Sequence, residues 1–285
     1  MIRLLRTLSL VAIAAVPFNL SVAKAADTGE PPVEVRLYTM DCGLAEFPDG
    51  DLFSDTGEYA GKHLALPTPC FLIKHGRDWM LWDTGLGDAM ASHPDGVEEG
   101  GARFVVKKTL ASQLAELGLK PQDVRFVGLS HLHFDHTGNI GLFPGSTFII
   151  PEKELSAALG KPTPFGIDPS ELAPLDQAVM ISTDGDYDVF GDGTVVTLTT
   201  PGHTPGHHSL AVKLQKSGMV LITGDLFHTH ENYDKGLVPR MNDRTYTLGS
   251  MDRFRRLAAN TKARIVIHHS PEDFKGMPKS PEFLD

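Results

Sequence analysis

Histidines and one aspartate are concentrated in a single short stretch of this 285-residue chain. The stretch is HLHFDH (131–136), and the whole chain has 13 histidines. Alternate residues of an extended segment share a face, so His131 and His133 can point at one ion, while the following turn lets Asp135 and His136 reach a second. Imidazole nitrogen and carboxylate oxygen are donors that Zn²⁺ favours. The stretch therefore predicts a site for two metal ions.

Two metal ions need more donors than six residues supply, and three candidates follow later strand-like segments. His203 lies in the Pro/Gly-rich loop TPGHTPGH (200–207), Asp225 follows the apolar run 218–223, and His269 follows the apolar run 263–267. Loops held at strand ends by a rigid sheet are where binding residues gather. We expect these three side chains to complete the site, with His268 as the competing choice for the last ligand.

The elements that must position these side chains are short strands with helices between them. Runs of β-branched, aromatic and aliphatic residues bounded by Gly, Asp and Pro predict strands at 33–40, 70–75, 78–82, 124–129, 146–150, 194–199, 209–214, 218–223 and 263–267. Apolar spacing of three to four residues and end signals predict helices at 105–118, 151–159 and 247–259. The absence of strict βαβ alternation argues against a doubly wound sheet. We expect an α/β fold of two sheets packed face to face, with helices outside, in one domain.

The first 25 residues have the pattern of an export signal. Arg3 and Arg6 precede a short apolar stretch, and Ala23-Lys24-Ala25 supplies the small residues that a signal peptidase needs. The alternative is an N-terminal membrane anchor, but the apolar run is short for a bilayer span. We expect a signal peptide over 1–25, a mature domain over 26–285 without stable membrane insertion, and a periplasmic or secreted protein.

Charge and cysteine usage limit the partners and the bonding expected of the chain. Removing the signal, which holds three basic residues and no acidic one, takes the net charge from −10 to −13. Such a surface repels phosphate backbones, which argues against nucleic-acid and membrane-surface partners. In an oxidising compartment Cys42 and Cys70 form either a disulfide or two buried thiols. The Cα separation decides between these, and the sequence leaves it open.

The motifs HLHFDH (131–136), PGHTPGH (201–207) and LITGD (221–225), with a last strand followed by histidine, resemble the metallo-β-lactamase superfamily. Within it the chain looks most like the N-acyl-homoserine lactonases, from about residue 33 to the end. The resemblance implies an αβ/βα sandwich of two mixed sheets and a centre with two Zn²⁺, where Fe, Mn or Co would also bind. It further implies a small-molecule lactone substrate. Because related lactonases are often dimers, a homodimer is one expected assembly.

Carried over position by position, the resemblance implies a role for each polar residue. It implies two groups of three ligands joined by a bridging carboxylate: His131, His133 and His203; Asp135, His136 and His269; and Asp225 between them. Asp83 and His207 would support these ligands without binding metal. Asp135 would also carry a proton from the attacking water to the leaving oxygen. Many homoserine lactonases place a tyrosine three residues after the bridging aspartate; here His228 would donate the hydrogen bond to the substrate carbonyl in its place.

The implied chemistry is hydrolysis of a cyclic ester. A water shared by two dications loses its proton near neutral pH and becomes a nucleophile without a serine or cysteine. We therefore expect a metal-dependent hydrolase that opens N-acyl-homoserine lactones or related lactones, which would make it quorum-quenching. We expect 44–67, 86–104 and 160–176 to shape its pocket.

Several alternatives share the same fold or the same ligands. Asp225 at the bridging position disfavours a β-lactamase, and the 16 residues that follow His269 leave no room for the helical domain of a glyoxalase II-type thioester hydrolase. A di-iron redox protein would need a carboxylate change in the ligand set and an added flavin domain. A non-catalytic metal-binding protein is the alternative from another class.

Overall fold

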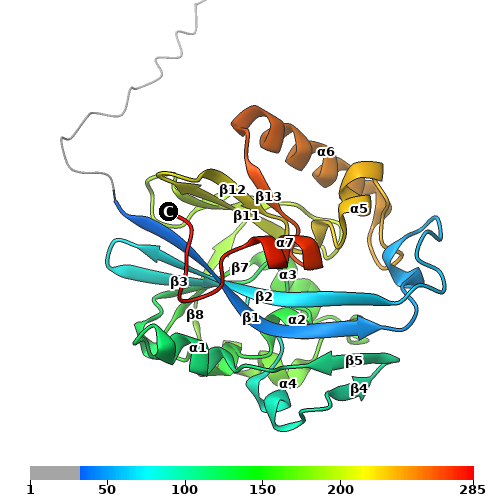
Figure 1. Cartoon of the computed structure of the whole chain (residues 1–285), viewed down its shortest axis with the longest axis horizontal. Coiled ribbons are helices and arrows are strands. Elements are labelled where there is room, and N and C mark those ends of the chain that lie inside the picture. The colour runs from blue at the N-terminus through cyan, green and yellow to red at the C-terminus, as the bar shows by residue number, and fades with distance from the viewer. Residues whose placement is uncertain (1–32) are drawn as a thin grey trace, which may run out of the picture. The chain divides into compact units, whose positions relative to one another are not determined.

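The computed structural model describes residues 33–285, which form a sandwich of two mixed β-sheets (Figure 1). The larger sheet has the strand order β4-β5-β1-β2-β3-β6-β7-β8, and the smaller one has the order β13-β12-β11-β10-β9. The expected two-sheet α/β fold is therefore confirmed. The predicted signal and the mature start at Ala26 lie outside the described residues. Within them, no helix has both the length and the apolar character needed to cross a membrane.

Thirteen strands and seven α-helices make up the described chain, with short 3₁₀ turns between them. The larger sheet contains β1 (Val35–Phe47), β2 (Leu64–His75), β3 (Asp78–Trp82), β4 (Val97–Glu99), β5 (Ala102–Val105), β6 (Phe126–Gly128), β7 (Thr147–Pro151) and β8 (Val179–Thr183). The smaller sheet contains β9 (Tyr187–Asp188), β10 (Val195–Thr199), β11 (His208–Leu214), β12 (Gly218–Ile222) and β13 (Arg264–Val266). The helices are α1 (Leu110–Glu116), α2 (Phe134–Thr137), α3 (Glu152–Ala158), α4 (Pro169–Leu172), α5 (His230–Lys235), α6 (Arg244–Thr261) and α7 (Pro271–Gly276).

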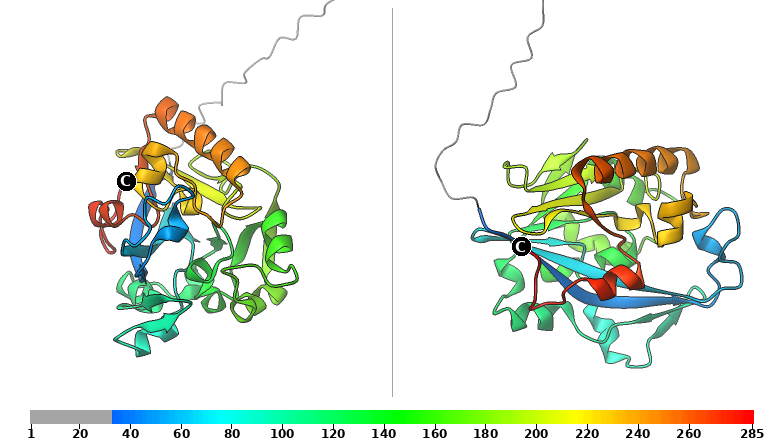
Figure 2. Two further views of the ribbon diagram at one scale, coloured as in Figure 1. Left: turned by 90° about the vertical axis from the view of Figure 1, so that its right-hand side faces the viewer. Right: turned by 45° about the horizontal axis from the view of Figure 1, so that its top comes forward.

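Successive side chains of the central strands pack into different cores. Leu72 of β2 packs with residues of α1 on the outer face of the larger sheet, whereas Phe71 and Ile73 pack into the core between the sheets. This alternation follows from the two-residue repeat of a strand. On the other side of the sandwich, α6 covers the smaller sheet with Met251 and Phe254 (Figure 2). Burial on both faces gives the site a rigid frame.

The predicted helix over 105–118 is too long at its start. α1 begins at Leu110, because the Thr109 side chain accepts a hydrogen bond from the Ser112 N–H and caps the helix. Residues 102–105 instead form β5, which pairs with β1. The strands predicted at 209–214 and 218–223 correspond to β11 and β12, which form an antiparallel hairpin with Leu214 opposite Gly218.

The candidate ligands leave the sandwich at strand ends that the two sheets bring together. β3 and β6 are parallel, with Trp82 opposite Gly128, so the residues after them emerge side by side. β12 and β13 are also parallel, with Ile222 opposite Val266. Because the carboxyl ends of parallel strands meet at one edge, the loops that hold the metal candidates converge.

A disulfide joins Cys42 of β1 to Cys70 of β2, with a Cα–Cα separation of 5.7 Å. The two side chains are buried, and the bond spans 28 positions of sequence. The alternative of two free thiols is therefore excluded. The bond ties together the strands at the centre of the larger sheet.

Replacing both cysteines by alanine is expected to destabilise the protein. The crosslink restricts the unfolded chain, and a loop of this length corresponds to a loss of roughly 3–4 kcal/mol. Urea unfolding of the double variant and the parent, both metal-loaded, measures the difference. An unchanged free energy of unfolding would show that the disulfide does not stabilise the fold.

Candidate metal centre

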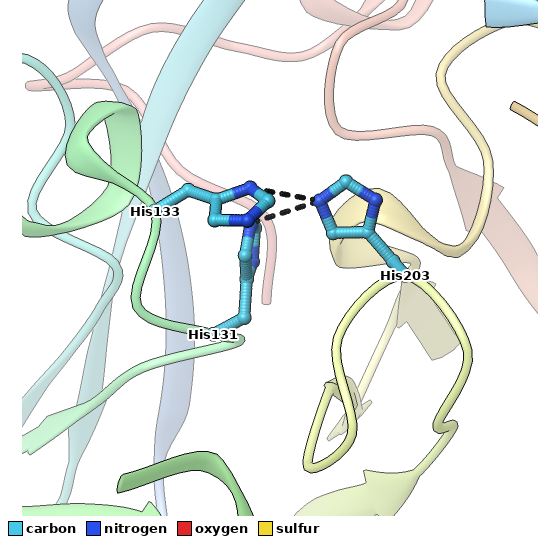
Figure 3. A group of neighbouring side chains, drawn as sticks. All are labelled: His131, His133 and His203. Atoms are coloured by element: carbon cyan, nitrogen blue, oxygen red, sulfur yellow. Dashed lines mark hydrogen bonds between the residues drawn. The ribbon is translucent and has the colours of Figure 1, made fainter. Parts of the chain in front are cut away.

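Three histidines from two loops converge on one point (Figure 3). His131 and His133 follow β6, and His203 lies in the loop between β10 and β11. The His203 Nε2 atom lies 3.2 Å from His131 Nε2 and 3.0 Å from His133 Nδ1. All three rings are buried. The structure thus brings together the three residues expected on one metal.

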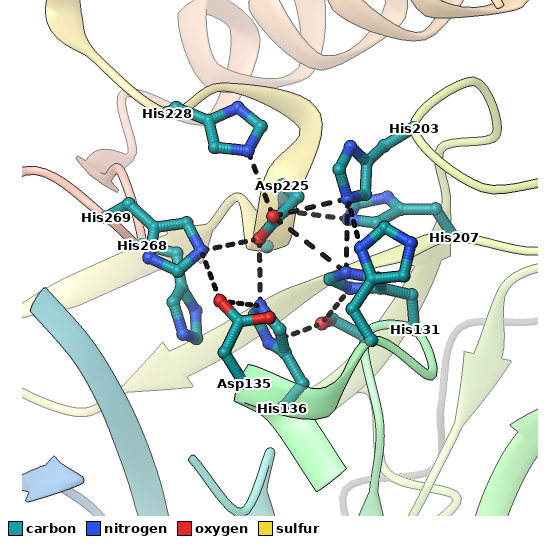
Figure 4. A network of polar contacts seen from close by, with 12 residues as sticks. His131, Asp135, His136, His203, His207, Asp225, His228, His268 and His269 are labelled. Carbon is teal, nitrogen blue, oxygen red and sulfur yellow. Dashed lines mark hydrogen bonds and ion pairs between the residues drawn. The ribbon is translucent and has the colours of Figure 1, made fainter. Parts of the chain in front are cut away.

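The second expected group surrounds the Asp225 carboxylate (Figure 4). Asp225 Oδ1 lies 3.1 Å from His136 Nε2 and 3.0 Å from His269 Nε2, whereas Oδ2 lies 3.3 Å from His203 Nε2. Asp135 Oδ2 lies 3.7 Å from Nε2 of both His136 and His269. Each oxygen of Asp225 therefore faces a different group, which is the geometry a bridging carboxylate needs.

The outer ring nitrogens of the candidate ligands are already bonded to the protein. Three of them donate to oxygens 2.8–3.0 Å away: His136 Nδ1 to Asp83 Oδ2, His203 Nδ1 to Asn242 Oδ1, and His269 Nδ1 to the Pro67 carbonyl. A neutral imidazole has one N–H, so its Nε2 atom then points a bare lone pair inward. Such outer partners are typical of metal-binding histidines.

The inner donor set fits metal cations. Bare nitrogens face one another and face carboxylate oxygens, an arrangement that is repulsive without positive charge between them. The buried atoms His136 Nε2 and Asp225 Oδ1 make no hydrogen bond, and such groups are costly to leave unpaired. Imidazole and carboxylate donors match Zn²⁺ and other divalent first-row metals. The described residues therefore form two adjacent clusters suited to metal.

The pKa shifts within the cluster likewise indicate that positive charge is stabilised there. Burial raises the pKa of Asp225, but His269, His136 and other imidazoles outweigh it and hold the pKa well below its ordinary value. Burial lowers the pKa of His136, but Asp225 and the other nearby carboxylates raise it well above its ordinary value, so without metal a proton on Nε2 would take the place of a cation beside Asp225. Burial and the neighbouring His136 depress the pKa of His131. The Asp225 carboxylate holds its charge and attracts cations.

Asp83 and His207 form hydrogen bonds with the candidate ligands His136 and Asp225. Asp83 has a left-handed backbone with φ of 57°, and its carboxylate accepts hydrogen bonds from the Ser130 N–H at 2.6 Å and from His136. Such strain persists where the surroundings enforce it. His207 Nδ1 donates to the Thr200 carbonyl at 3.0 Å, so Nε2 accepts from the Asp225 N–H at 2.8 Å. Burial lowers the pKa of His207 to about 3, which keeps this acceptor available.

His268 and His228 occupy different positions around the centre. His268 Nδ1 lies 3.8 Å from Asp83 Oδ2, behind His136, and neither of its nitrogens makes a hydrogen bond. His269, not His268, faces Asp135 and Asp225. His228 Nε2 lies 3.0 Å from Asp225 Oδ2, and its ring stacks on His269 with centroids 5.4 Å apart.

The other histidines lie away from the metal candidates. His75 pairs with Asp192 at 2.8 Å and His230 with Asp273 at 3.1 Å. His208 Nε2 lies 3.4 Å from the Thr199 hydroxyl. His63 and His93 are exposed. Within the described residues, none of these five histidines belongs to a potential metal-binding group.

The metal candidates form the floor of a cavity of about 550 Å³, a volume typical of small-molecule sites. His133, Asp135, His203, Asp225, His228 and His269 line the floor. The walls come from 44–67, 86–104 and 160–176, as predicted, together with Phe134 and Met241. They are mostly apolar, and within 33–285 no lysine or arginine lines the cavity. At Gly166 (φ 76°) a Cβ would lie 2.6 Å from the His133 ring, so only glycine lets this wall approach the floor.

Asn242 and the Pro67 carbonyl are functional contacts that the sequence did not indicate. Asn242 precedes α6, and Pro67 lies within β2, 202 positions before His269. Neither residue lies in a sequence motif, and both contacts form only in the folded chain.

Several known proteins with similar sequence and structure are named as lactonases. Residues 64–269 match the metallo-beta-lactamase superfamily. The chain is 32% identical to the N-acyl homoserine lactonase AttM of Azorhizobium caulinodans, over 88% of this chain and 99% of that one. It is 32% identical to the N-acyl homoserine lactonase of Bacillus cereus, over 79% of this chain and 89% of that one.

A solved structure resembles the described fold over most of the chain. It is an N-acyl homoserine lactone hydrolase with the product N-hexanoyl-L-homoserine bound at the catalytic metal center. It superposes with a TM-score of 0.77 and 29% identity, covering 89% of this chain and 100% of that one. From the matched segment, the shared length and the common fold, this chain belongs to the metallo-beta-lactamase superfamily.

Proposed function

We propose that this protein is a metal-dependent hydrolase that opens the lactone ring of N-acyl-homoserine lactones, and thereby acts in quorum quenching. The observation that carries the proposal is the cavity, whose floor holds the metal candidates and whose walls are mostly apolar. A polar ring seated on the floor and an acyl chain along the walls would satisfy both surfaces. The names of the similar lactonases support the same substrate class.

The proposed centre holds two Zn²⁺ ions, with Fe, Mn or Co as alternatives that the donors accept. His131, His133 and His203 would hold one ion, Asp135, His136 and His269 the other, and Asp225 would bridge them. When bound, the two ions supply a nucleophile from water at neutral pH and polarise the substrate carbonyl. The chain provides the geometry, because the outer partners of His136, His203 and His269 fix these three rings before metal arrives.

Asp135 is the residue proposed to move the proton. Its side chain is 18% exposed, against 4% for Asp225, so it has access to the cavity. A carboxylate there can accept a proton from the attacking water and deliver it to the ring oxygen. The bond between the carbonyl carbon and the ring oxygen then breaks, and the product is a hydroxy acid.

The charge of the cavity favours a neutral lactone over the substrates of the competing functions. Glu99, Asp168 and Glu171 line the walls, and no cationic side chain of the described chain does so. The Ser170 hydrogen bonds lower the pKa of Asp168, which stays charged, whereas burial raises the pKa of Glu171 to about 7. β-Lactam antibiotics and glutathione thioesters carry carboxylates that would meet these walls without a counter-charge.

We further propose that the protein works in the periplasm or outside the cell, after removal of residues 1–25. The basic residues and short apolar stretch of that segment support export. The disulfide between Cys42 and Cys70 also supports it, because such bonds persist in oxidising compartments. Lactones are small molecules that such an enzyme would meet without a nucleic-acid or membrane partner. A homodimer is the assembly we would test first.

The proposal predicts metal-dependent turnover of neutral lactones. A screen over N-acyl-homoserine lactones, β-lactams and thioesters should show hydrolysis of the lactones above all, measured by pH-stat. Stripping the metal with a chelator should abolish that hydrolysis, and Zn²⁺ or Co²⁺ should restore it. Activity that persists in a verified metal-free sample would contradict the mechanism, and a preference for β-lactams or thioesters would contradict the substrate class.

Asp225→Ala should lower metal content as well as rate. Its two oxygens face both groups of ligands, so its loss weakens both sites. Metal content per chain, measured by elemental analysis after dialysis, should fall below that of the parent. Two full equivalents of metal in this variant would show that Asp225 does not bridge.

His228→Phe should lower kcat/KM on lactones at least about tenfold, a loss of about 1.4 kcal/mol. The imidazole N–H would orient the substrate carbonyl. Where such a donor acts alone, its loss typically costs more than this, but here a metal ion would polarise the same carbonyl. Metal content should not change, and His228→Tyr should recover part of the rate.

Two outcomes would overturn this role for His228. A parent-like rate in His228→Phe would make it a bystander. Loss of metal in the same variant would instead identify it as a ligand, since Nε2 lies near His203 and Asp225 in one potential metal-binding group.

A further inference from the structure

We infer that Glu154 is a positioning residue that couples the two loops of the first metal site, formed by His131, His133 and His203. Glu154 belongs to the first turn of α3, outside the motifs that indicated the site, and it does not line the cavity. Its side chain is only 2% exposed. A buried carboxylate with no role in the proposed chemistry requires an explanation.

The two oxygens of Glu154 each accept a hydrogen bond from a different ligand loop. Oε1 accepts from the Leu132 N–H at 3.0 Å, and Oε2 accepts from the Gly206 N–H at 2.9 Å. Leu132 lies between His131 and His133, and Gly206 lies three positions after His203. One carboxylate therefore connects the backbone of both segments that carry the three histidines.

The close approach of the 200–207 loop to α3 depends on a glycine at the second contact, Gly206. A Cβ at Gly206 would lie 2.4 Å from the Glu154 backbone nitrogen and 2.6 Å from its Cβ. Only glycine allows the loop to lie this close to α3, so the Glu154 carboxylate can reach the Gly206 N–H. The contact is therefore part of how the 200–207 loop is placed.

The second metal site is held by other contacts. Its histidines His136 and His269 are bonded to Asp83 and to the Pro67 carbonyl, and neither bond involves Glu154. The His203 ring is fixed by Asn242, but its backbone segment is tied to the HLHFDH segment through Glu154. Loss of Glu154 should therefore act on one metal site and largely spare the other.

The test is the separate occupancy of the two metal sites in Glu154→Gln. Glutamine keeps the size but replaces one acceptor oxygen with an NH₂ group, which cannot accept from a backbone N–H. Losing such a supporting partner typically costs about 10–100-fold in metal affinity. We expect that loss at the first site alone, measured as Zn²⁺ occupancy by anomalous scattering in crystals after dialysis against graded chelator.

Glu152→Gln is the matched control, because Glu152 lies on the same helix turn and is exposed. It should keep both occupancies at the parent level. If Glu154→Gln does not fold, Glu154→Asp replaces it: the charge remains, but the shorter side chain cannot reach both N–H groups, and the same selective loss is expected. Equal loss at both sites, or no loss at either, would overturn the inference.

The inference rests on the proposed two-metal centre, and the parent sample tests that separately. If the parent protein holds two metals and the variant loses neither, only the role of Glu154 fails. If the parent protein holds no metal at the His131, His133 and His203 site, the proposed centre itself fails.

Discussion

The organisation of this protein depends on one electrostatic constraint: bare imidazole lone pairs and carboxylate oxygens converge in a buried space. In their neutral form His136, His203 and His269 each give their one N–H to an outer oxygen, so their inner nitrogens then have only lone pairs to present to Asp225. Burial makes the resulting repulsion costly. Divalent cations bound between these donors would remove the repulsion. The donor set as a whole, more than any single distance, therefore indicates a metal site.

Holding such a repulsive arrangement before metal binds requires a frame that cannot relax. The parallel pairs β3/β6 and β12/β13 deliver ligands from both sheets to one edge, and side chains of the central strands are buried on both faces. The left-handed backbone of Asp83, fixed by its bonds to Ser130 and His136, shows that local strain is tolerated there. The packed sheets supply the rigidity on which the chemistry relies.

The sequence predicted the parts of this site that are local. Two patterns identified the donors: three histidines and an aspartate within six residues, and polar residues directly after apolar strands. Each pattern spans only a few positions of sequence. The start of α1 was missed because the apolar spacing continues into β5, and only the Thr109 cap distinguishes them. Asn242 and Glu154 carry no local pattern, since their partners lie 22 to 52 positions away. Long-range contacts of this kind depend on the folded topology.

The division between floor and walls explains why the metal motif alone does not determine a substrate. The floor uses donors that serve any hydrolysis in which two cations activate water, so it is compatible with lactones, β-lactams and thioesters alike. Two divalent cations bound there would outweigh the two carboxylates and leave the floor net positive, which by itself would attract anions. The walls oppose that attraction, because Asp168 stays charged and no cation among the described residues balances it. A neutral lactone avoids this conflict on entry, whereas its ring-opened carboxylate product meets it. If the walls select a neutral substrate in this way, the same walls would also favour release of the anionic product.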